Sequence, residues 1–280
     1  MERAAAAGGS SSSSRGFVVD GLTVQDHKQL VESTIPWEGS VVRIIRVSKK
    51  NVLETGTAFL VFRGEKRSLF LTCDHKFLKK KMGEVIRFCN GDRDYPVEKI
   101  HYRDVARDLL LFSVKGDVPE SPCVEFSTDK IEQHDKVAIL GHTTPTLPDK
   151  NGELVQLLVT KPGLYTGRIC CDAYRREDIQ EYYEKIIYSF PVACSGGSPL
   201  FRNGKVIGLH LACDGRWRDG VSARTVLQVL KEWLGVGKDN PIKELLQMVY
   251  DKIEPYVPDE EAESQVKANK KRATKKKRFD

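Results

Sequence analysis

The chain has 280 residues, of which 40% are hydrophobic and 30% are charged, and its formal net charge at pH 7 is +6. This length can bury the core of one or two domains, and this composition is that of an ordinary globular protein. No stretch approaches the roughly 18 apolar residues that a membrane-spanning helix needs, so no membrane partner is expected.

The N-terminal segment, residues 1–21, is rich in Ala, Gly and Ser. It lacks the apolar region of a secretory signal. Its Ser and Arg content is compatible with a transit peptide, but Glu2 and the short length argue against one. We therefore predict a disordered leader.

The centre of the chain is predicted to consist mainly of short strands. β-Branched and aromatic residues recur in short runs, which turn-forming residues such as Asn90-Gly91-Asp92 separate. The runs are Ser40 to Val47, Thr57 to Arg63, Ser68 to Cys73, Val85 to Cys89, Leu109 to Val114, Lys136 to Gly141, Leu154 to Thr160, Leu164 to Cys171, Lys185 to Phe190 and Lys205 to Leu211. Many short strands indicate a sandwich or a barrel, and composition alone does not distinguish the two.

Two helices and a basic tail are predicted after the strands. Apolar residues recur at helical spacing in Ser222 to Leu234 and in Pro241 to Ile253. Basic clusters follow between Lys270 and Arg278, and such clusters are typical of nuclear import signals, polyanion-binding patches or solubilising tails. The rest of the chain is close to neutral, so nucleic acid is not expected as the main partner. The predicted segments are a leader at 1–21, a domain at 36–236, and a helix with a basic tail at 240–280.

The cysteines indicate a reducing compartment. Their number is odd and no export signal precedes them, which favours free thiols in the cytoplasm or the nucleus. No pair has CxxC spacing and no glycine-rich phosphate loop is present, so neither a metal nor a cofactor is expected. The seven residues are Cys73, Cys89, Cys123, Cys170, Cys171, Cys194 and Cys213.

Four short segments occur in an order that suggests nucleophilic catalysis. A serine hydroxyl is a weak nucleophile and needs an imidazole to take its proton, and a carboxylate must orient that imidazole. Glycines beside the nucleophile let backbone N–H groups face the oxyanion. The segments are Gly56-Thr57-Ala58-Phe59-Leu60-Val61, Leu71-Thr72-Cys73-Asp74-His75, Asp108-Leu109-Leu110-Leu111, and Cys194-Ser195-Gly196-Gly197-Ser198-Pro199-Leu200-Phe201.

These segments resemble the motifs of the chymotrypsin-like serine proteases, and among them the HtrA-type and other intracellular trypsin-like enzymes. The resemblance covers roughly Trp37 to Gly235. It implies an all-β fold of two antiparallel six-stranded β-barrels, here with C-terminal helices. It also implies a serine endopeptidase that cleaves protein or peptide substrates. His75 would be the general base, Asp108 the orienting carboxylate and Ser195 the nucleophile.

The loop around Ser195 departs from the family pattern. Ala193 and Cys194 stand where the family usually has Gly and then Asp or Asn. The family's oxyanion hole would here use the N–H groups of Ala193 and Ser195, and a side chain at Ala193 puts that donor in question. One residue is also inserted before Pro199. Aligning on Pro199 would place Gly196 at the nucleophile position, but we favour the frame that keeps Ser-Gly-Gly. The alternative function is a catalytically inactive, protease-like peptide-binding module.

Two further residues suggest a substrate preference. His210 follows Gly208-Leu209 on the strand that lines the family's specificity pocket, and its ring can donate a hydrogen bond to a P1 carboxylate or amide. Ser189 occupies the pocket-floor position and is not acidic, which argues against a Lys or Arg preference. We therefore expect Glu or Gln at P1. Asp74 and Asp104 are expected to be surface loop charges.

Overall fold

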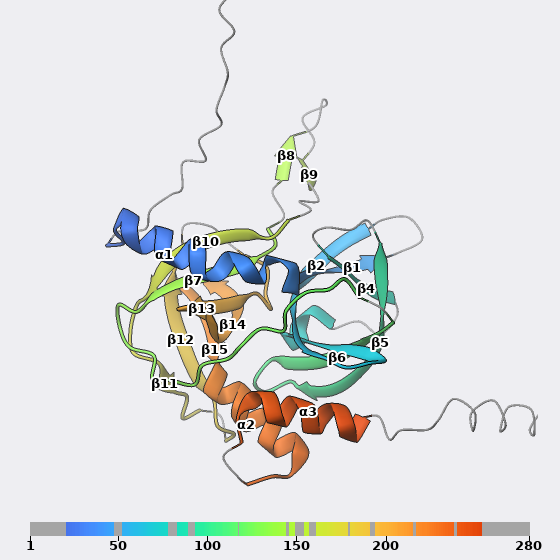
Figure 1. Cartoon of the computed structure of the whole chain (residues 1–280). Helices are drawn as coiled ribbons and strands as arrows, with labels where there is room; N and C mark the ends of the chain where they lie inside the picture. The colour runs from blue at the N-terminus through green and yellow to red at the C-terminus, as the bar shows by residue number, and fades with distance from the viewer. Residues whose placement is uncertain are drawn as a thin grey trace, which may run out of the picture.

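The N-terminal half of the chain forms a closed antiparallel barrel in the strand order β1-β2-β3-β6-β5-β4 (Figure 1). The structure is a computed structural model that describes residues 21–47, 52–77, 83–88, 93–116, 118–143, 146–148, 154–156, 161–178, 180–190, 194–214, 217–237 and 240–253. The strands of this barrel are β1 (Val41–Val47), β2 (Val52–Arg63), β3 (Arg67–Thr72), β4 (Gly83–Arg87), β5 (Asp94–Asp104) and β6 (Leu109–Lys115).

Apolar side chains that alternate along the strands fill the first barrel. Ile44, Leu60, Phe70, Ile86 and Phe112 are fully buried, because every second residue of a barrel strand points inward. The rings of Phe70 and Phe112 stack with their centroids 5.5 Å apart. Since β3 pairs antiparallel with β6, the residues just after β3 lie beside those just before β6.

The second barrel is built from the later strands in the order β10-β7-β13-β14-β15-β12, and pairing between β10 and β12 closes it. Ile139, Ile169, Ile186, Leu200 and Ile207 belong to its buried core. Its strands are β7 (Lys136–Gly141), β10 (Gly163–Ile169), β12 (Glu184–Ser189), β13 (Pro199–Arg202), β14 (Lys205–Asp214) and β15 (Trp217–Ser222), with β11 (Tyr174–Arg175) beside β12 and a separate hairpin of β8 (Thr146–Pro148) and β9 (Leu154–Gln156). The predicted fold of two six-stranded barrels is therefore confirmed.

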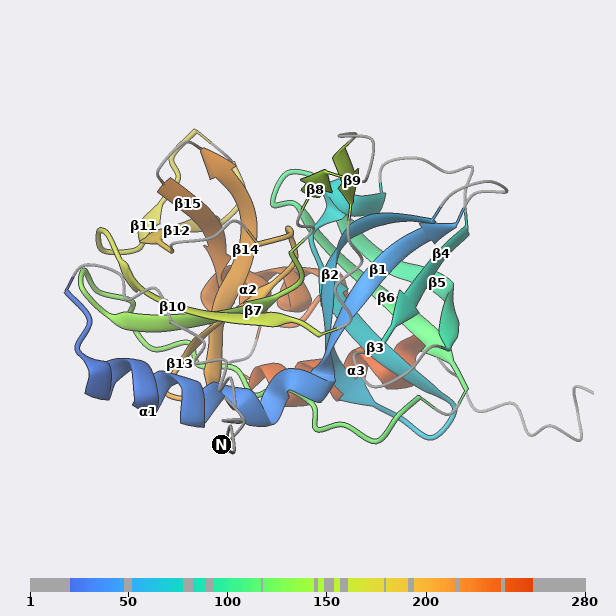
Figure 2. The same ribbon diagram turned by 90° about the horizontal axis from the view of Figure 1, so that it is seen from above.

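Among the described residues, three α-helices pack outside the barrels. α1 (Val24–Thr34) lies along the second barrel and leads through η1 (Ile35–Ser40) into β1 (Figure 2). α2 (Ala223–Leu234) follows β15 directly, with the Ser222 side chain as its N-cap and Gly235 left-handed at φ +69° after its last turn. α3 (Ile242–Ile253) packs on α2. The two C-terminal helices were predicted with nearly these bounds.

The helix α1 lies outside the predicted domain, which was drawn from residue 36. His27 Nδ1 lies 2.8 Å from the hydroxyl of Thr166 on β10, and Lys136 on β7 forms an ion pair with Asp26 at 2.6 Å. The packed body therefore begins before residue 36. Residues 1–20 of the predicted leader at 1–21, and residues 254–280 of the predicted tail, lie outside the described residues.

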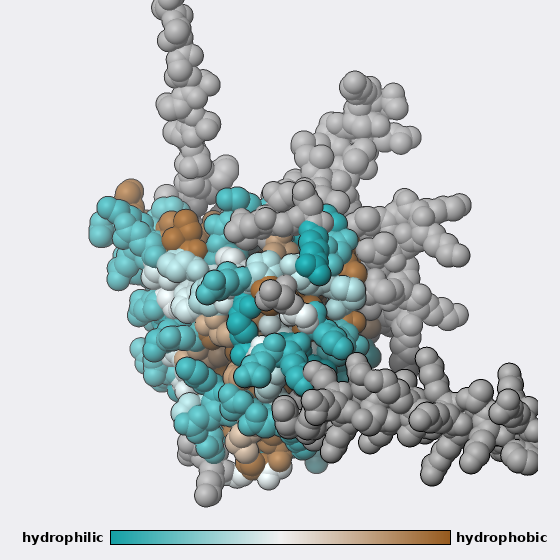
Figure 3. All heavy atoms as spheres, turned by 45° about the vertical axis from the view of Figure 1, so that its right-hand side comes forward, coloured by the Kyte–Doolittle hydropathy of each residue, from teal (hydrophilic) through white to brown (hydrophobic). Residues whose placement is uncertain are grey.

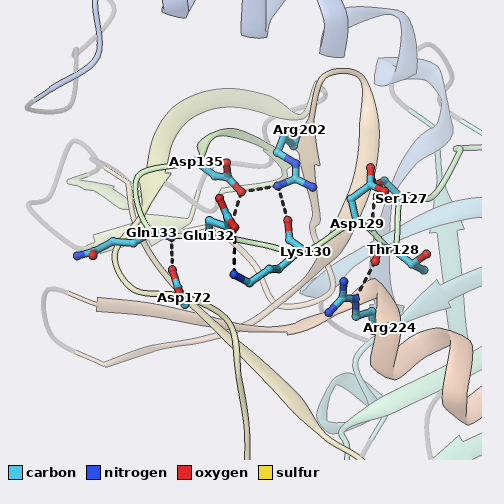
Figure 4. A network of polar contacts seen from close by, with 10 residues as sticks. All are labelled: Ser127, Thr128, Asp129, Lys130, Glu132, Gln133, Asp135, Asp172, Arg202 and Arg224. Carbon is cyan, nitrogen blue, oxygen red and sulfur yellow. Dashed lines mark hydrogen bonds and ion pairs between the residues drawn. The ribbon is translucent and has the colours of Figure 1, made fainter.

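A polar network attaches the segment between the barrels to the second barrel (Figure 4). Arg202 of β13 donates to the carbonyl oxygen of Lys130 at 2.9 Å and pairs with Asp135. Arg224 of α2 donates to the carbonyl oxygen of Thr128 at 2.7 Å. This segment is consequently fixed to β13 of the second barrel and to the start of α2.

Most predicted strands are present, but several elements were not predicted: α1, β5, β8, β11, β13 and β15. β5 carries mostly polar, partly exposed residues and so lacks a clear alternation. α1 buries only Leu30 and Thr34, which leaves a thin apolar stripe. The predicted run Leu154 to Thr160 is observed as β9, and residues 157–160 lie outside the described ranges.

Polar and charged side chains cover most of the described surface on the face shown in Figure 3, with apolar residues in small groups between them. Within the ranges that the structure describes, no helix has both the length and the apolar character that crossing a bilayer requires. The large apolar side chains lie instead mainly in the cores of the barrels.

Candidate active site

The structure brings His75 and Asp108 together at the ends of two neighbouring strands. His75 lies in η2 (Asp74–Phe77), just after β3, and Asp108 immediately precedes β6. Nδ1 of His75 is 2.6 Å from Oδ2 of Asp108, and the backbone N–H of His75 donates to Oδ1 of Asp108 at 2.8 Å. A carboxylate at Nδ1 keeps the proton on that nitrogen and leaves Nε2 as a proton acceptor. The pair therefore has the geometry of a general base and its orienting acid.

The turn that carries Asp108 is held by buried charges. Asp108 has a positive φ of 55°, a conformation that Asp tolerates better than most residues. Arg107 is only 4% exposed; its Nε donates to Asp104 at 2.7 Å, and its guanidinium pairs with Glu232 of α2. The rings of Tyr102 and Trp233 stack beside this network. The helix α2 thus helps to fix the loop of the catalytic candidate.

The charges at Asp74 and Asp104 are not the surface loop charges that the sequence suggested. Asp74 is 2% exposed and pairs with Nε of Arg103 at 2.5 Å. Asp104 pairs with the buried Arg107. The prediction was wrong because β5, which supplies the arginine partner of Asp74, was not recognised as a strand.

Ser195 makes its contacts with the second barrel. Its N–H and its Oγ both donate to the carbonyl oxygen of His142, at 2.9 and 2.5 Å. Nε2 of His75 instead lies 3.8 Å from Sγ of Cys73. Among the described residues, the structure therefore places Cys73 rather than the Ser195 hydroxyl at the basic nitrogen. Ala193, the other predicted oxyanion donor, lies outside those residues.

The glycines after Ser195 lie close to the first barrel. The carbonyl oxygen of Gly196 accepts a hydrogen bond from the N–H of Thr57 at 3.0 Å. A side-chain carbon built on Gly196 would lie 2.9 Å from Sγ of Cys73, and one built on Gly197 would lie 2.1 Å from the carbonyl oxygen of Thr57. Gly197 also has φ +88°, so only glycine fits there without strain. It is therefore Gly196 that borders the thiol in contact with His75, which is the geometry that the alignment on Pro199 implies.

His210 is buried beside a tyrosine that the sequence did not single out. Its Nδ1 lies 2.7 Å from the hydroxyl of Tyr188, and its Nε2 lies 3.1 Å from the carbonyl oxygen of Cys194. A carbonyl can only accept, so Nε2 carries the proton and the Tyr188 hydroxyl donates to Nδ1. Burial lowers the pKa of His210 to about 4, so the ring is neutral at pH 7. Ser189, the predicted pocket-floor residue, is the last residue of β12, and its cross-strand neighbour is Arg168 of β10.

His142 is a second buried histidine next to the site. It is 1% exposed, and burial, with the Arg43 charge nearby, lowers its pKa to about 3. Its N–H donates to Oγ1 of Thr57 at 3.1 Å. His142 therefore joins the Ser195 loop to the first barrel through its backbone. Cys73 could have been identified as a site residue from the sequence, because it is a thiol two residues before His75. No sequence pattern marked His142 or Tyr188.

Cys73, His75 and Asp108 are also close enough to hold a metal ion. The carboxylate lies at Nδ1 of the ring and the thiol at Nε2, so the two groups flank different nitrogens. The arrangement suits proton transfer better than metal binding.

Comparison with known proteins gives the family. The model of the trypsin-like peptidase domain matches residues 56–209, and no curated protein matches the sequence. The active form of the Rv3671c protease from M. tuberculosis is 20% identical, with a TM-score of 0.54 over 85% of this chain and 96% of that one. The HtrA-type protease AlgW, solved with a decapeptide, is 14% identical, with a TM-score of 0.55 over 75% and 67%. Identities this low show the fold alone, but the family model covers more than half of the sequence, so this chain belongs to the trypsin-like peptidase domain family.

Proposed function

We propose that this chain is an endopeptidase that cleaves peptide bonds in protein or peptide substrates by acyl transfer. The hydrogen bond between Nδ1 of His75 and Asp108 supports this function most directly, in a family of peptidases. A structural relative, AlgW, was solved with a decapeptide, which is consistent with a peptide ligand here. The reaction needs no metal or cofactor, because the base, the nucleophile and the oxyanion donors are all supplied by the chain.

The proposed nucleophile is Ser195. His75 would take the proton of its hydroxyl, the oxygen would attack the scissile carbonyl, and the N–H groups of Ala193 and Ser195 would stabilise the oxyanion. Both the Oγ and the N–H of Ser195 donate to the carbonyl oxygen of His142. The turn must therefore release His142 before Ser195 can act, which makes the observed arrangement a resting one.

A second candidate function is a catalytically inactive module that binds peptides. The contact of Ser195 with His142, together with the position of Gly196 beside Cys73, favours it. In that case, the protein would retain the substrate-binding surface of a peptidase without turning substrate over.

Labelling with a fluorophosphonate probe separates these functions. Such probes react with an activated serine, so the wild type should be labelled and the variant Ser195→Ala should not. Ser127→Ala is the matched control, because Ser127 lies in the exposed segment between the barrels, where its hydroxyl donates to Asp129. Absence of labelling in folded wild-type protein would favour the binding module, and labelling that persists in Ser195→Ala would exclude Ser195 as the serine that reacts.

We further propose that His210 selects Glu or Gln at P1, with Gln preferred at pH 7. A neutral Nε2–H donates well to an amide oxygen but offers no charge to a carboxylate. The substrate would compete with the carbonyl oxygen of Cys194 for this proton. Profiling with a peptide library should show cleavage after Gln above cleavage after Glu, and His210→Val should reduce this preference. Dominant cleavage after Lys or Arg would contradict the assignment.

We also propose that the protein resides in the cytoplasm or the nucleus. Cys73, Cys123, Cys170, Cys171 and Cys194 are free thiols in the structure, which suits a reducing compartment. The basic clusters between residues 270 and 278, outside the described residues, have the composition that nuclear import receptors recognise.

A further inference from the structure

We propose that Cys73 is the nucleophile of this site in place of Ser195 and that His75 activates its thiol, an inference that rests on the proposed peptidase function and changes only its attacking group. Sγ of Cys73 lies 3.8 Å from Nε2 of His75, the nitrogen that the contact with Asp108 leaves free to accept a proton. Within the described part of the chain, Asp108 and Cys73 are the hydrogen-bonding neighbours of the ring. A thiol, a base and an orienting carboxylate are therefore lined up in that order.

The turn after Ser195 leaves room for this thiol. Gly196 has no side chain, and a carbon added there would meet Sγ of Cys73 at 2.9 Å and the carbonyl oxygen of Leu211 at 2.9 Å. The sulfur of Cys73 therefore lies where it would clash with any side chain at residue 196. The Ser195 hydroxyl donates to the carbonyl oxygen of His142, whereas the Cys73 thiol is in contact with Nε2 of His75.

A lysine side chain lies near the thiol. Carbons added to Gly56 and to Gly196 would lie 2.7 Å from Cγ and 2.8 Å from Cε of Lys76, so this chain runs across both glycines. Cys73 is fully buried, and this burial, together with the Asp108 carboxylate, raises the pKa of its thiol. The resting group is consequently a protonated thiol. Because the sulfur is fully buried, a bound peptide must displace part of its surroundings to reach it.

The chemical steps follow the acyl-transfer scheme. Nε2 of His75 takes the thiol proton while sulfur attacks the carbonyl carbon, and the carbonyl electron pair moves to oxygen. The tetrahedral intermediate collapses, the C–N bond breaks, and the proton on Nε2 passes to the leaving amine. Water, deprotonated by the same nitrogen, then attacks the thioester. The acid product leaves, and the proton returns to sulfur.

The test pairs a thiol-directed probe with hydrolysis of the same peptide. A peptide vinyl sulfone with Gln at its P1 position should form one adduct on Cys73, found by mass spectrometry, and the adduct should vanish in Cys73→Ala and in His75→Ala. Hydrolysis should fall at least about 10³-fold in Cys73→Ala. Cys123→Ala is the matched control, because Cys123 is a half-buried thiol in the segment between the barrels, and it should retain both signals.

A nucleophile exchange keeps the test independent of folding defects. Cys73→Ser preserves the shape of the side chain, so the folded variant should lose the vinyl sulfone adduct and gain a fluorophosphonate adduct on residue 73. The inference is overturned if Cys73→Ala hydrolyses normally while Ser195→Ala does not, a result that leaves the proposed peptidase function intact. A His75-dependent adduct on Cys73 without any hydrolysis would support the nucleophile and overturn the peptidase function.

Discussion

Replacing Asp108 with Asn should lower peptide hydrolysis by about 10⁴-fold with little change in the fold. The carboxylate accepts the Nδ1 proton of His75 at 2.6 Å, and an amide in its place can present its NH₂ group to that nitrogen instead. The ring would then carry its proton on Nε2, where it cannot accept one. The measurement is kcat/KM on a peptide that the wild type cleaves, with folding checked by circular dichroism.

His75→Ala should cause a loss at least as large, because the base itself is removed. The expectation holds for either candidate nucleophile, since both Ser195 and Cys73 would pass their proton to His75. Asp178→Asn is a matched control, because Asp178 is an exposed carboxylate that pairs with Arg176, and its activity should be unchanged. An Asp108→Asn variant that keeps more than a tenth of the wild-type kcat/KM would contradict the assigned role.

Lowering the pH from 7 to 5 should cost the folded state about 4 kcal/mol through two buried histidines. His142 and His210 have pKa values lowered to about 3 and about 4 in the fold, mainly by burial. An unfolded histidine titrates near 6.5, so each contributes about 1.4 kcal/mol for every pH unit below that value, or about 2 kcal/mol at pH 5.

The sign follows from proton binding. Between pH 6.5 and 4 the unfolded chain binds more protons than the folded one, so acid favours unfolding. The stabilisation is complete above pH 6.5 and is lost as the pH falls toward the folded pKa values. Charged neighbours act in addition to burial. Arg43 lowers the pKa of His142 further. Arg218 and Lys76 lower the pKa of His210, whereas Asp219 raises it.

Urea unfolding at pH 7, 6 and 5 measures this dependence. Each of His142→Asn and His210→Asn should reduce the loss between pH 7 and pH 5 by about 2 kcal/mol, whatever its effect on stability at pH 7. His134→Asn is the control, since His134 is exposed and its φ of 72° suits Asn. A stability that is equal at pH 7 and pH 5 in the wild type would show that these rings do not titrate as inferred.

The strands of the barrels were predictable where most residues of a strand are apolar and buried. Leu109–Lys115 is buried at all but its last residue, and its apolar run is visible in the sequence. Asp94–Asp104 is also a strand, although only one of its residues is buried. It is a strand because it pairs with β4 on one side and with β6 on the other. A polar strand of this kind is set by its pairing with neighbouring strands, which periodicity along the sequence cannot show.

The sequence by itself determined the family fold and the pair of His75 and Asp108. Each of these residues stands at the end of a short apolar strand with a recognisable motif, so local patterns were sufficient. Which side chain faces the base was decided only by the tertiary structure. His142 holds Ser195 and Thr57 holds Gly196 through backbone hydrogen bonds between segments distant in sequence. Such bonds leave no trace in the residues of the loop, because any residue supplies the same carbonyl.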